Sequence, residues 1–146
     1  MKRIIMMVLR NILLVPWMWA KLCYHASHVD KYTEEEHYRM LRFITHRANK
    51  GGNVTIDAHG LENIPEENGF MFFPNHQGLY DVLALVDVCP KPFSVVAKKE
   101  VANVPFLKQV FECMKAYMID REDVRQSLQV IVLSLIHISE PTRRSY

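Results

Sequence analysis

The segment FMFFPNHQGLYDVLALV, residues 70–86, reads as a strand, a loop and a helix in succession. Phe70 to Phe73 form a short apolar run, and the proline and glycine that follow it favour a loop. From Val82 onward the apolar side chains recur as they do on a helix. The segment therefore predicts a strand that delivers His76 to a loop, with Asp81 at the start of the next helix.

His76 and Asp81 can act together only if they do not share one continuous helix. Positions i and i+5 lie roughly 140° apart on an α-helix, because each residue turns about 100°. We therefore expect His76 in the loop and Asp81 in the first helical turn. An imidazole with an ordinary pKa of about 6.5 can take the proton of an attacking hydroxyl, and a carboxylate on its other ring nitrogen fixes the tautomer. In the alternative interpretation, Asp81 only caps the helix.

Residues 75–81, Asn-His-Gln-Gly-Leu-Tyr-Asp, resemble the N-H-x-x-x-x-D signature of the glycerolipid acyltransferases, the bacterial lysophosphatidate (1-acylglycerol-3-phosphate) acyltransferases in particular. The resemblance implies that His76 is the general base and that Asp81 orients it. Asn75 and Gly78 would shape the loop around the substrate. The resemblance also implies transfer of a fatty acyl group from acyl-CoA or acyl carrier protein to the sn-2 hydroxyl of lysophosphatidate, giving phosphatidate. Because the acyl thioester is already activated, no serine nucleophile, metal or organic cofactor is implied.

Two further segments resemble the same family. Residues 92–100 are a short, buried strand-like run that ends in charge, and the resemblance makes Lys98 a phosphate contact. The run at 117–119 leads into Asp120 and Arg121, which resembles the family's second motif on the glycerophosphate side of the site. Arginine suits phosphate because its planar guanidinium donates two hydrogen bonds at once. The alternatives are a solvated lysine at a strand end and a surface salt bridge of Arg121 with an acidic neighbour.

The resemblance stops near Ile131. The family's third motif, of the Phe-Pro-Glu-Gly-Thr-Arg type, and its later proline-containing segment do not follow. Residues 133–143 instead resemble the conceptual translation of a transposase-based sequencing adapter, and such scars are excluded from fold reasoning. We expect a membrane-associating segment at 1–30, a partial and inactive acyltransferase domain at 31–131, and a non-native tail at 132–146. The alternative is a genuine natural tail.

The middle of the chain predicts one long helix. Thr33 and Glu36 fit a capping box at its start. Acidic residues fill its first turn, and a glycine pair at 51 and 52 provides a stop. The side chains expected to face inward are Tyr38, Leu41, Phe43 and Ile44.

Strands and helices alternate along the rest of the chain. We expect strands at Val54 to His59, Phe70 to Phe73, Phe93 to Ala97 and Tyr117 to Ile119, with a helix from Pro105 to Met114. This alternation predicts an α/β fold, and the resemblance implies an acyltransferase-like sheet flanked by helices whose C-terminal part is missing. The functional groups would lie on loops at strand ends.

The amino-terminal segment is apolar but interrupted. Its runs at 4–9 and 12–19 are broken by Arg10 and Pro16, whereas a membrane-spanning helix needs about 20 predominantly apolar residues. We expect a basic helix or helix pair in the membrane interface, peripheral or shallowly anchored, on the anionic cytoplasmic face of the cell membrane. A core helix with a proline bend and a shallow transmembrane anchor are the alternatives. The aromatic side chains expected near the headgroups are Trp17, Trp19 and Tyr24.

Composition and spacing narrow the other functional classes. A formal net charge of +2 and the absence of a glycine-rich phosphate loop or zinc-finger spacing give no indication of nucleic-acid binding. Three widely separated cysteines fit a reducing compartment and buried apolar roles better than a disulfide framework or a thiol nucleophile. His25 and His28 alone are a weak metal signal, so we predict no metal site. The rival functional class is a non-catalytic lipid-binding module of the membrane surface.

Overall fold

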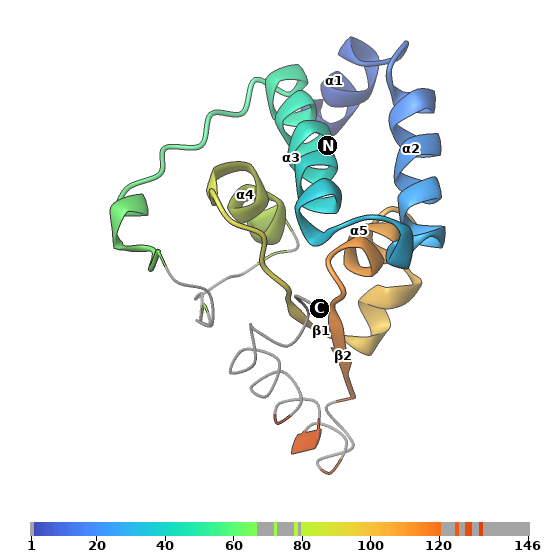
Figure 1. The fold of residues 1–146 in the computed structure, drawn as a ribbon. Helices are drawn as coiled ribbons and strands as arrows, with labels where there is room; N and C mark the ends of the chain where they lie inside the picture. The colour runs from blue at the N-terminus through green and yellow to red at the C-terminus, as the bar shows by residue number, and fades with distance from the viewer. Residues whose placement is uncertain are drawn as a thin grey trace.

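The computed structural model describes residues 2–66, 72, 78, 80–120, 125, 128, 129 and 132. The helices are α1 (Lys2–Arg10), α2 (Val15–Ser27), α3 (Glu34–Gly51), α4 (Tyr80–Val88) and α5 (Leu107–Cys113), with short 3-10 helices η1 (Val29–Lys31), η2 (Leu61–Asn63) and η3 (Lys99–Asn103). The strands are β1 (Val96–Lys98) and β2 (Tyr117–Ile119). Helix α3 lies at the centre and contacts α1, α2, α4 and α5 (Figure 1).

The hydrophobic core lies where α2, α3, α4 and α5 meet. Its buried members are Met18, Leu22, Ala26, Tyr38, Met40, Leu41, Ile44, Val86, Val110, Cys113 and Met114. These residues come from four helices and the residue after α5, spread over much of the chain, so apolar burial between helices holds this layer together. The described part of the chain contains more helix and less strand than the alternating sequence pattern predicts.

The described sheet is small and parallel. β1 pairs with β2 in a register that places Val96 opposite Tyr117 and Lys98 opposite Ile119. The position and length of β2 confirm the strand predicted at 117–119. β1 begins at Val96, whereas the sequence analysis predicted a start at Phe93. The prediction of a buried strand is wrong, since Val96 and Lys98 are exposed and only one described strand flanks β1. The chain passes from β1 through η3 and α5 to β2, which is the strand–helix–strand order of an α/β unit.

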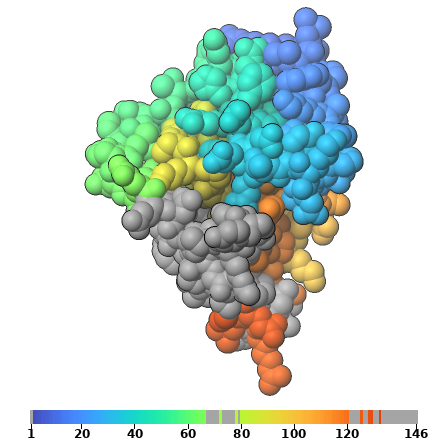
Figure 2. Space-filling view, viewed as in Figure 1, coloured from blue at the N-terminus to red at the C-terminus, as the bar shows by residue number. Residues whose placement is uncertain are grey.

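The predicted strand at Val54 to His59 is wrong. Side chains there alternate as on a strand, with Val54, Ile56 and Ala58 half-buried and the intervening side chains exposed. No strand among the described residues pairs with this segment, which runs along the surface beside α4 (Figure 2). A strand requires a neighbour for its backbone hydrogen bonds, so the alternating pattern alone was insufficient. Of the strand predicted at Phe70 to Phe73, only Phe72 lies among the described residues.

The predicted beginning and end of helix α3 are confirmed, with Thr33 as its N-cap and Gly52 as its C-cap. Thr33 Oγ1 accepts from the Glu36 N–H at 3.2 Å, and the Thr33 N–H donates to the Glu36 carboxylate at 2.8 Å. Phe43 is 44% exposed, which corrects its predicted inward orientation. It lies two positions, roughly 200°, from the buried Leu41 on the helix. Instead, its ring meets Trp17 edge-on, with centroids 6.0 Å apart.

The glycine pair that ends α3 also allows α1 to approach it. A Cβ on Gly51 would lie 2.4 Å from Asn11 Nδ2, and one on Gly52 would lie 2.6 Å from the Met7 side chain. Asn11 is buried and donates to the carbonyls of Met7 and Arg47, at 2.8 and 3.1 Å. These bonds attach the α1–α2 joint to α3, and a side chain at Gly51 would displace the Asn11 amide that makes them.

The amino-terminal break predicted near Arg10 is present between α1 and α2. No single helix in the described ranges has the length and apolar character to cross a membrane, but α1 and α2, bent by 93°, satisfy that criterion as a pair. Helix α2 buries Met18 and Leu22 in the core, whereas large apolar side chains elsewhere on the pair are exposed. They are Ile4, Ile5, Val8, Leu9, Ile12, Leu13, Trp17, Trp19 and Tyr24. The pair thus packs one face inward and presents another outward.

Candidate functional site

Helix α4 places Asp81 in its first turn, as the sequence predicts. Asp81 Oδ2 accepts from the Gly78 N–H at 3.0 Å, while the Asp81 N–H donates to the Gly78 carbonyl at 3.2 Å. The carboxylate therefore turns back toward the loop that precedes α4. His76 and Asn75 lie outside the described residues. A carboxylate has about four acceptor positions, so the bond to Gly78 is compatible with both the orienting role and the capping role of Asp81.

Gly78 is exposed at the entrance to α4. A Cβ built at this position would meet no described atom within 4 Å. The glycine is therefore not required for packing between the parts of the chain that the structure describes.

Polar contacts with α3 set the orientation of α4. The Asn49 amide donates to Asp87 Oδ2 at 2.8 Å, and its carbonyl oxygen accepts from the Tyr80 hydroxyl. The Tyr38 hydroxyl donates to the Cys89 carbonyl at 3.0 Å, just beyond the end of α4. Burial raises the pKa of Tyr38 well above its ordinary value, so the hydroxyl remains a donor. Both ends of α4, and hence Asp81, are positioned by α3.

Sequence reasoning did not identify these supporting residues. Asn49 and Asp87 are distant in the chain, and no motif connects them. The available signal was a polar residue, Asn49, two positions before the glycine pair on a helix with a marked apolar face. Asn49 is buried in the structure, and burial of an amide requires hydrogen-bond partners. A polar residue at a buried helix position can therefore indicate a neighbouring anchor.

The carboxyl ends of β1 and β2, which precede the two predicted phosphate contacts, lie at one edge of the sheet. Lys98 ends β1 opposite Ile119, and Arg121 follows two residues later but lies outside the described residues. Lys99 Nζ lies 3.8 Å from Asp120 Oδ2. This ion pair is at the surface and contributes little stability. Lys98 is exposed on β1, whereas Asp81 is on α4, so the site's predicted members come from separate elements of the fold.

A family model described as Acyltransferase matches residues 55–139. The match covers more than half of the chain and includes every predicted site residue from Asn75 to Arg121, whereas the supporting Tyr38 and Asn49 precede it. The chain belongs to the acyltransferase family. It is also 27% identical over 74 residues to a 1-acyl-sn-glycerol-3-phosphate acyltransferase of Borreliella burgdorferi, an alignment that covers 51% of this chain and 30% of that relative. No solved structure matches this chain.

The cysteines of this acyltransferase-family chain are free thiols in structural positions. Cys89 and Cys113 are buried, and Cys23 is partly buried. Burial raises the pKa of Cys113 to about 12, which keeps its sulfur protonated at neutral pH. A protonated thiol is a poor nucleophile. Cys113 therefore acts as a small core residue, and Cys89 packs beside the Tyr38 anchor.

His25 pairs with His37, and His28 is directed elsewhere. The Nδ1 atoms of His25 and His37 lie 3.2 Å apart in the buried joint between α2 and α3. His37 Nε2 lies 3.1 Å from the Val29 carbonyl, which can only accept, so this nitrogen carries the proton. In neutral His37 the Nδ1 atom is then the acceptor, and His25 Nδ1–H donates to it. In the ranges that the structure describes, no group of three His, Cys, Asp or Glu side chains could hold a metal ion.

The His25 environment predicts a loss of stability in mild acid. Burial lowers the pKa of His25 below 6.5, and His37 and Lys21 lower it further, against a smaller opposing effect of Glu36. The Tyr32 ring stacks on the His25 ring at 4.2 Å. The unfolded chain binds the proton more readily than the folded chain. The stabilising contribution of His25 should therefore be complete above about pH 6.5 and should be lost as the pH falls through the lowered pKa. Thermal melts from about pH 7.5 to about pH 5 measure this decline.

His25→Gln is the matched control for that decline. An amide at this position can still donate to His37 but cannot take up a proton, so its melting temperature should depend less on pH in this range. The Glu36 pKa is lowered by hydrogen bonds from Thr33, and its contribution is lost only below about pH 4.5. An unchanged pH dependence in His25→Gln would contradict the prediction.

Proposed function

We propose that the protein transfers a fatty acyl group from acyl-CoA or acyl carrier protein to the sn-2 hydroxyl of lysophosphatidate. His76 takes the hydroxyl proton as the oxygen attacks the thioester carbonyl, and the thiol leaves. Asp81 holds the imidazole in the reactive tautomer and stabilises the imidazolium. The observation that supports this assignment most directly is the Asp81 carboxylate, which turns back from α4 toward the loop of the family signature.

Lys98 and Arg121 bind the glycerophosphate in this proposal. The parallel register, which puts the carboxyl ends of β1 and β2 at the same edge of the sheet, supports this assignment. Lysine offers a mobile point charge there, and arginine offers a planar pair of donors for phosphate oxygens. Asn75 and Gly78 shape the loop that precedes α4 in the chain. The proposed chemistry uses no metal or organic cofactor.

The protein acts at the cytoplasmic face of the cell membrane, in the same proposal. Exposed apolar and aromatic side chains of α1 and α2 support an interfacial position for the bent pair. Lys21 Nζ lies 5.1 Å from the centre of the Trp17 ring, which combines a basic group with an interfacial aromatic residue. A bilayer position would give the site direct access to a lysophospholipid.

An acyl-transfer assay tests the proposal. The chain covers 30% of its Borreliella relative, so the assay uses both the 146-residue chain and the longest open reading frame recovered from the source locus. We expect phosphatidate from lysophosphatidate and an acyl donor with the longer protein, and none with the 146-residue chain. Vesicle binding without acyl transfer by the longer protein would instead establish the non-catalytic membrane module. The exposed surface of α1 and α2 favours that second function if the first fails.

Asp81→Asn should lose much of the rate while retaining the fold. Asparagine keeps an oxygen that can accept from the Gly78 N–H, but it loses the negative charge that stabilises an imidazolium. Initial rates and thermal melts of the longer protein measure the two effects separately. Unfolding of Asp81→Asn at an unchanged specific rate of its folded fraction would support the capping role.

A further inference from the structure

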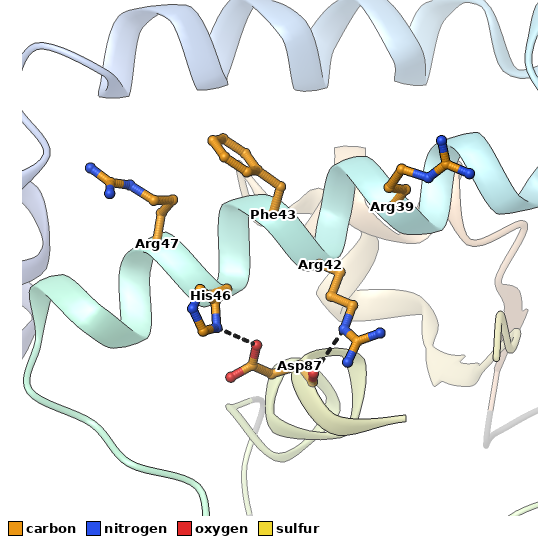
Figure 3. Close-up of a pocket in the computed structure, with 6 residues that line it drawn as sticks. All are labelled: Arg39, Arg42, Phe43, His46, Arg47 and Asp87. Atoms are coloured by element: carbon orange, nitrogen blue, oxygen red, sulfur yellow. Dashed lines mark hydrogen bonds and ion pairs between the residues drawn. The ribbon is translucent and has the colours of Figure 1, made fainter. Parts of the chain in front are cut away.

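A basic hollow lies on the outer face of α3, away from Asp81. It has a volume of about 300 Å³, and its lining residues are Arg39, Arg42, Phe43, His46, Arg47 and Asp87 (Figure 3). The five α3 residues follow i, i+3, i+4, i+7, i+8 spacing, so they form one continuous helical face. Asp87 comes from the opposite end of α4 to Asp81, about 9 Å along the helix. The hollow is therefore separate from the residues that the proposed reaction uses.

The charge of the hollow favours an anion. Three guanidinium groups and one carboxylate line the hollow, which leaves an excess of two formal positive charges when histidine is counted as neutral. The Asp87 carboxylate already accepts from the Asn49 amide and from His46 Nδ1, at 2.8 and 3.3 Å. The Asp87 carboxylate thus uses part of its hydrogen-bonding capacity to hold α4 against α3. The positive excess is carried by planar groups that can each donate two parallel hydrogen bonds to phosphate.

One arginine donor in the hollow lacks a protein partner. Arg47 Nε is buried and makes no hydrogen bond with any described atom. By contrast, Arg42 Nε donates to the Asp87 carbonyl at 3.0 Å. In Figure 3, Arg39 and Arg47 point away from the Asp87 side of α3. A buried charged donor without an acceptor is unfavourable, so Arg47 would gain a hydrogen bond by turning this donor outward to an anionic oxygen in the hollow.

The rim of the hollow continues into the exposed aromatic surface of α2. Phe43, in the lining, meets the Trp17 ring edge-on, and Lys21 lies over the Trp17 ring. Trp17 is half exposed, and Leu13, one turn earlier, is almost fully exposed. A ligand that fits this surface combines an anionic head with an apolar body. A membrane phospholipid has this combination, whereas free phosphate has only the first part.

We propose that the hollow binds the phosphate of an anionic membrane phospholipid. Arg39 and Arg47 lie two helical turns apart on either side of Phe43, so they contact neighbouring headgroups, and Trp17 lies at the level of the interface. This inference rests on the membrane position in the proposed function but not on the acyl-transfer chemistry. Because α3 also anchors α4, lipid bound here fixes the orientation of the Asp81 helix relative to the bilayer.

Vesicle sedimentation tests the proposal with two matched double variants of the 146-residue chain. Arg39→Gln/Arg47→Gln removes both charges, whereas Arg39→Lys/Arg47→Lys retains them and removes the planar guanidinium geometry. The vesicles are phosphatidylcholine with and without phosphatidylglycerol. We expect the glutamine pair to lower partition onto the anionic vesicles about 25-fold, because each basic group near such a surface contributes about five-fold. We expect the lysine pair also to bind more weakly than the wild-type chain.

The outcomes separate a phosphate site from general attraction. Wild-type binding by the lysine pair, or by both pairs, would overturn the proposal. Displacement of the chain by coenzyme A but not by inorganic phosphate at equal ionic strength would assign the hollow to a soluble phosphate donor and would also overturn it. Far-ultraviolet circular dichroism checks that each variant is folded. Acyl transfer to detergent-dispersed lysophosphatidate by the longer protein tests the reaction separately, so the two proposals fail in different assays.

Discussion

Replacing His76 with alanine should lower acyl transfer at least ~100-fold while the fold is retained. The methyl group cannot take the hydroxyl proton, so the attacking oxygen remains a weak nucleophile. Because the general base acts in the transition state, we expect kcat and kcat/KM to fall together. Initial rates with lysophosphatidate and an acyl donor, measured on the longest open reading frame of the locus, provide the test.

His59→Ala is the matched control for His76→Ala. His59 lies within the region that matches the family model, but it is exposed and lies 3.1 Å from the Asp57 carboxylate. Its loss should leave the rate close to that of the wild-type protein. Near-normal rates in His76→Ala would exclude this histidine as the general base. An equal loss in both variants would point to a general effect of removing a histidine from this region.

Replacing Leu22 with alanine should destabilise the chain by about 2–5 kcal/mol. Leu22 is 1% exposed and belongs to the core cluster in which α2 meets the helices that follow it. Truncation removes apolar burial and leaves a cavity that close-packed neighbours fill only in part. Small domains have total stabilities of only about 5–15 kcal/mol, so this loss is large. Urea unfolding of the 146-residue chain measures it.

Leu13→Ala supplies the same chemical change at the surface. Leu13 is 91% exposed, so its truncation should alter the free energy of unfolding by less than about 0.5 kcal/mol. The pair of variants also distinguishes two interpretations of the amino terminus. A core role for α2 predicts a large difference between the two sites. Equal, small effects would show that α2 does not pack on α3 in solution, as expected of a separate membrane anchor.

Local signals predicted the elements that stabilise themselves locally. The reciprocal bonds of Thr33 and Glu36 join residues three positions apart, so the start of α3 was readable from the chain. Asp81 in the first turn of α4 followed from the loop residues before it and the apolar spacing after it. The alternation of Val54, Ile56 and Ala58 was real, but a strand did not form because hydrogen-bonding partners are a property of the tertiary fold.

Long-range contacts decided what the sequence patterns left open. Phe43 had the apolar character of a core residue, yet its position on the α3 helix turns it toward Trp17 at the surface. The arginines on one face of α3 line a hollow that is completed by Asp87 from α4. His25 and His37 become partners only because α2 folds back on α3. Contacts across 12 to 41 residues require the packing of whole helices, which local spacing does not encode.

The order of residues was enough to predict the family signature around His76, the capped helix, the position of β2 and the interruption of the apolar amino terminus. These features depend on neighbouring residues, whose spacing sets their chemistry and geometry directly. Only the tertiary structure decided how Asn49 and Tyr38 hold α4, which apolar side chains remain outside, and where arginines gather. Those outcomes depend on burial, and burial is shared among helices that meet only when the chain has folded.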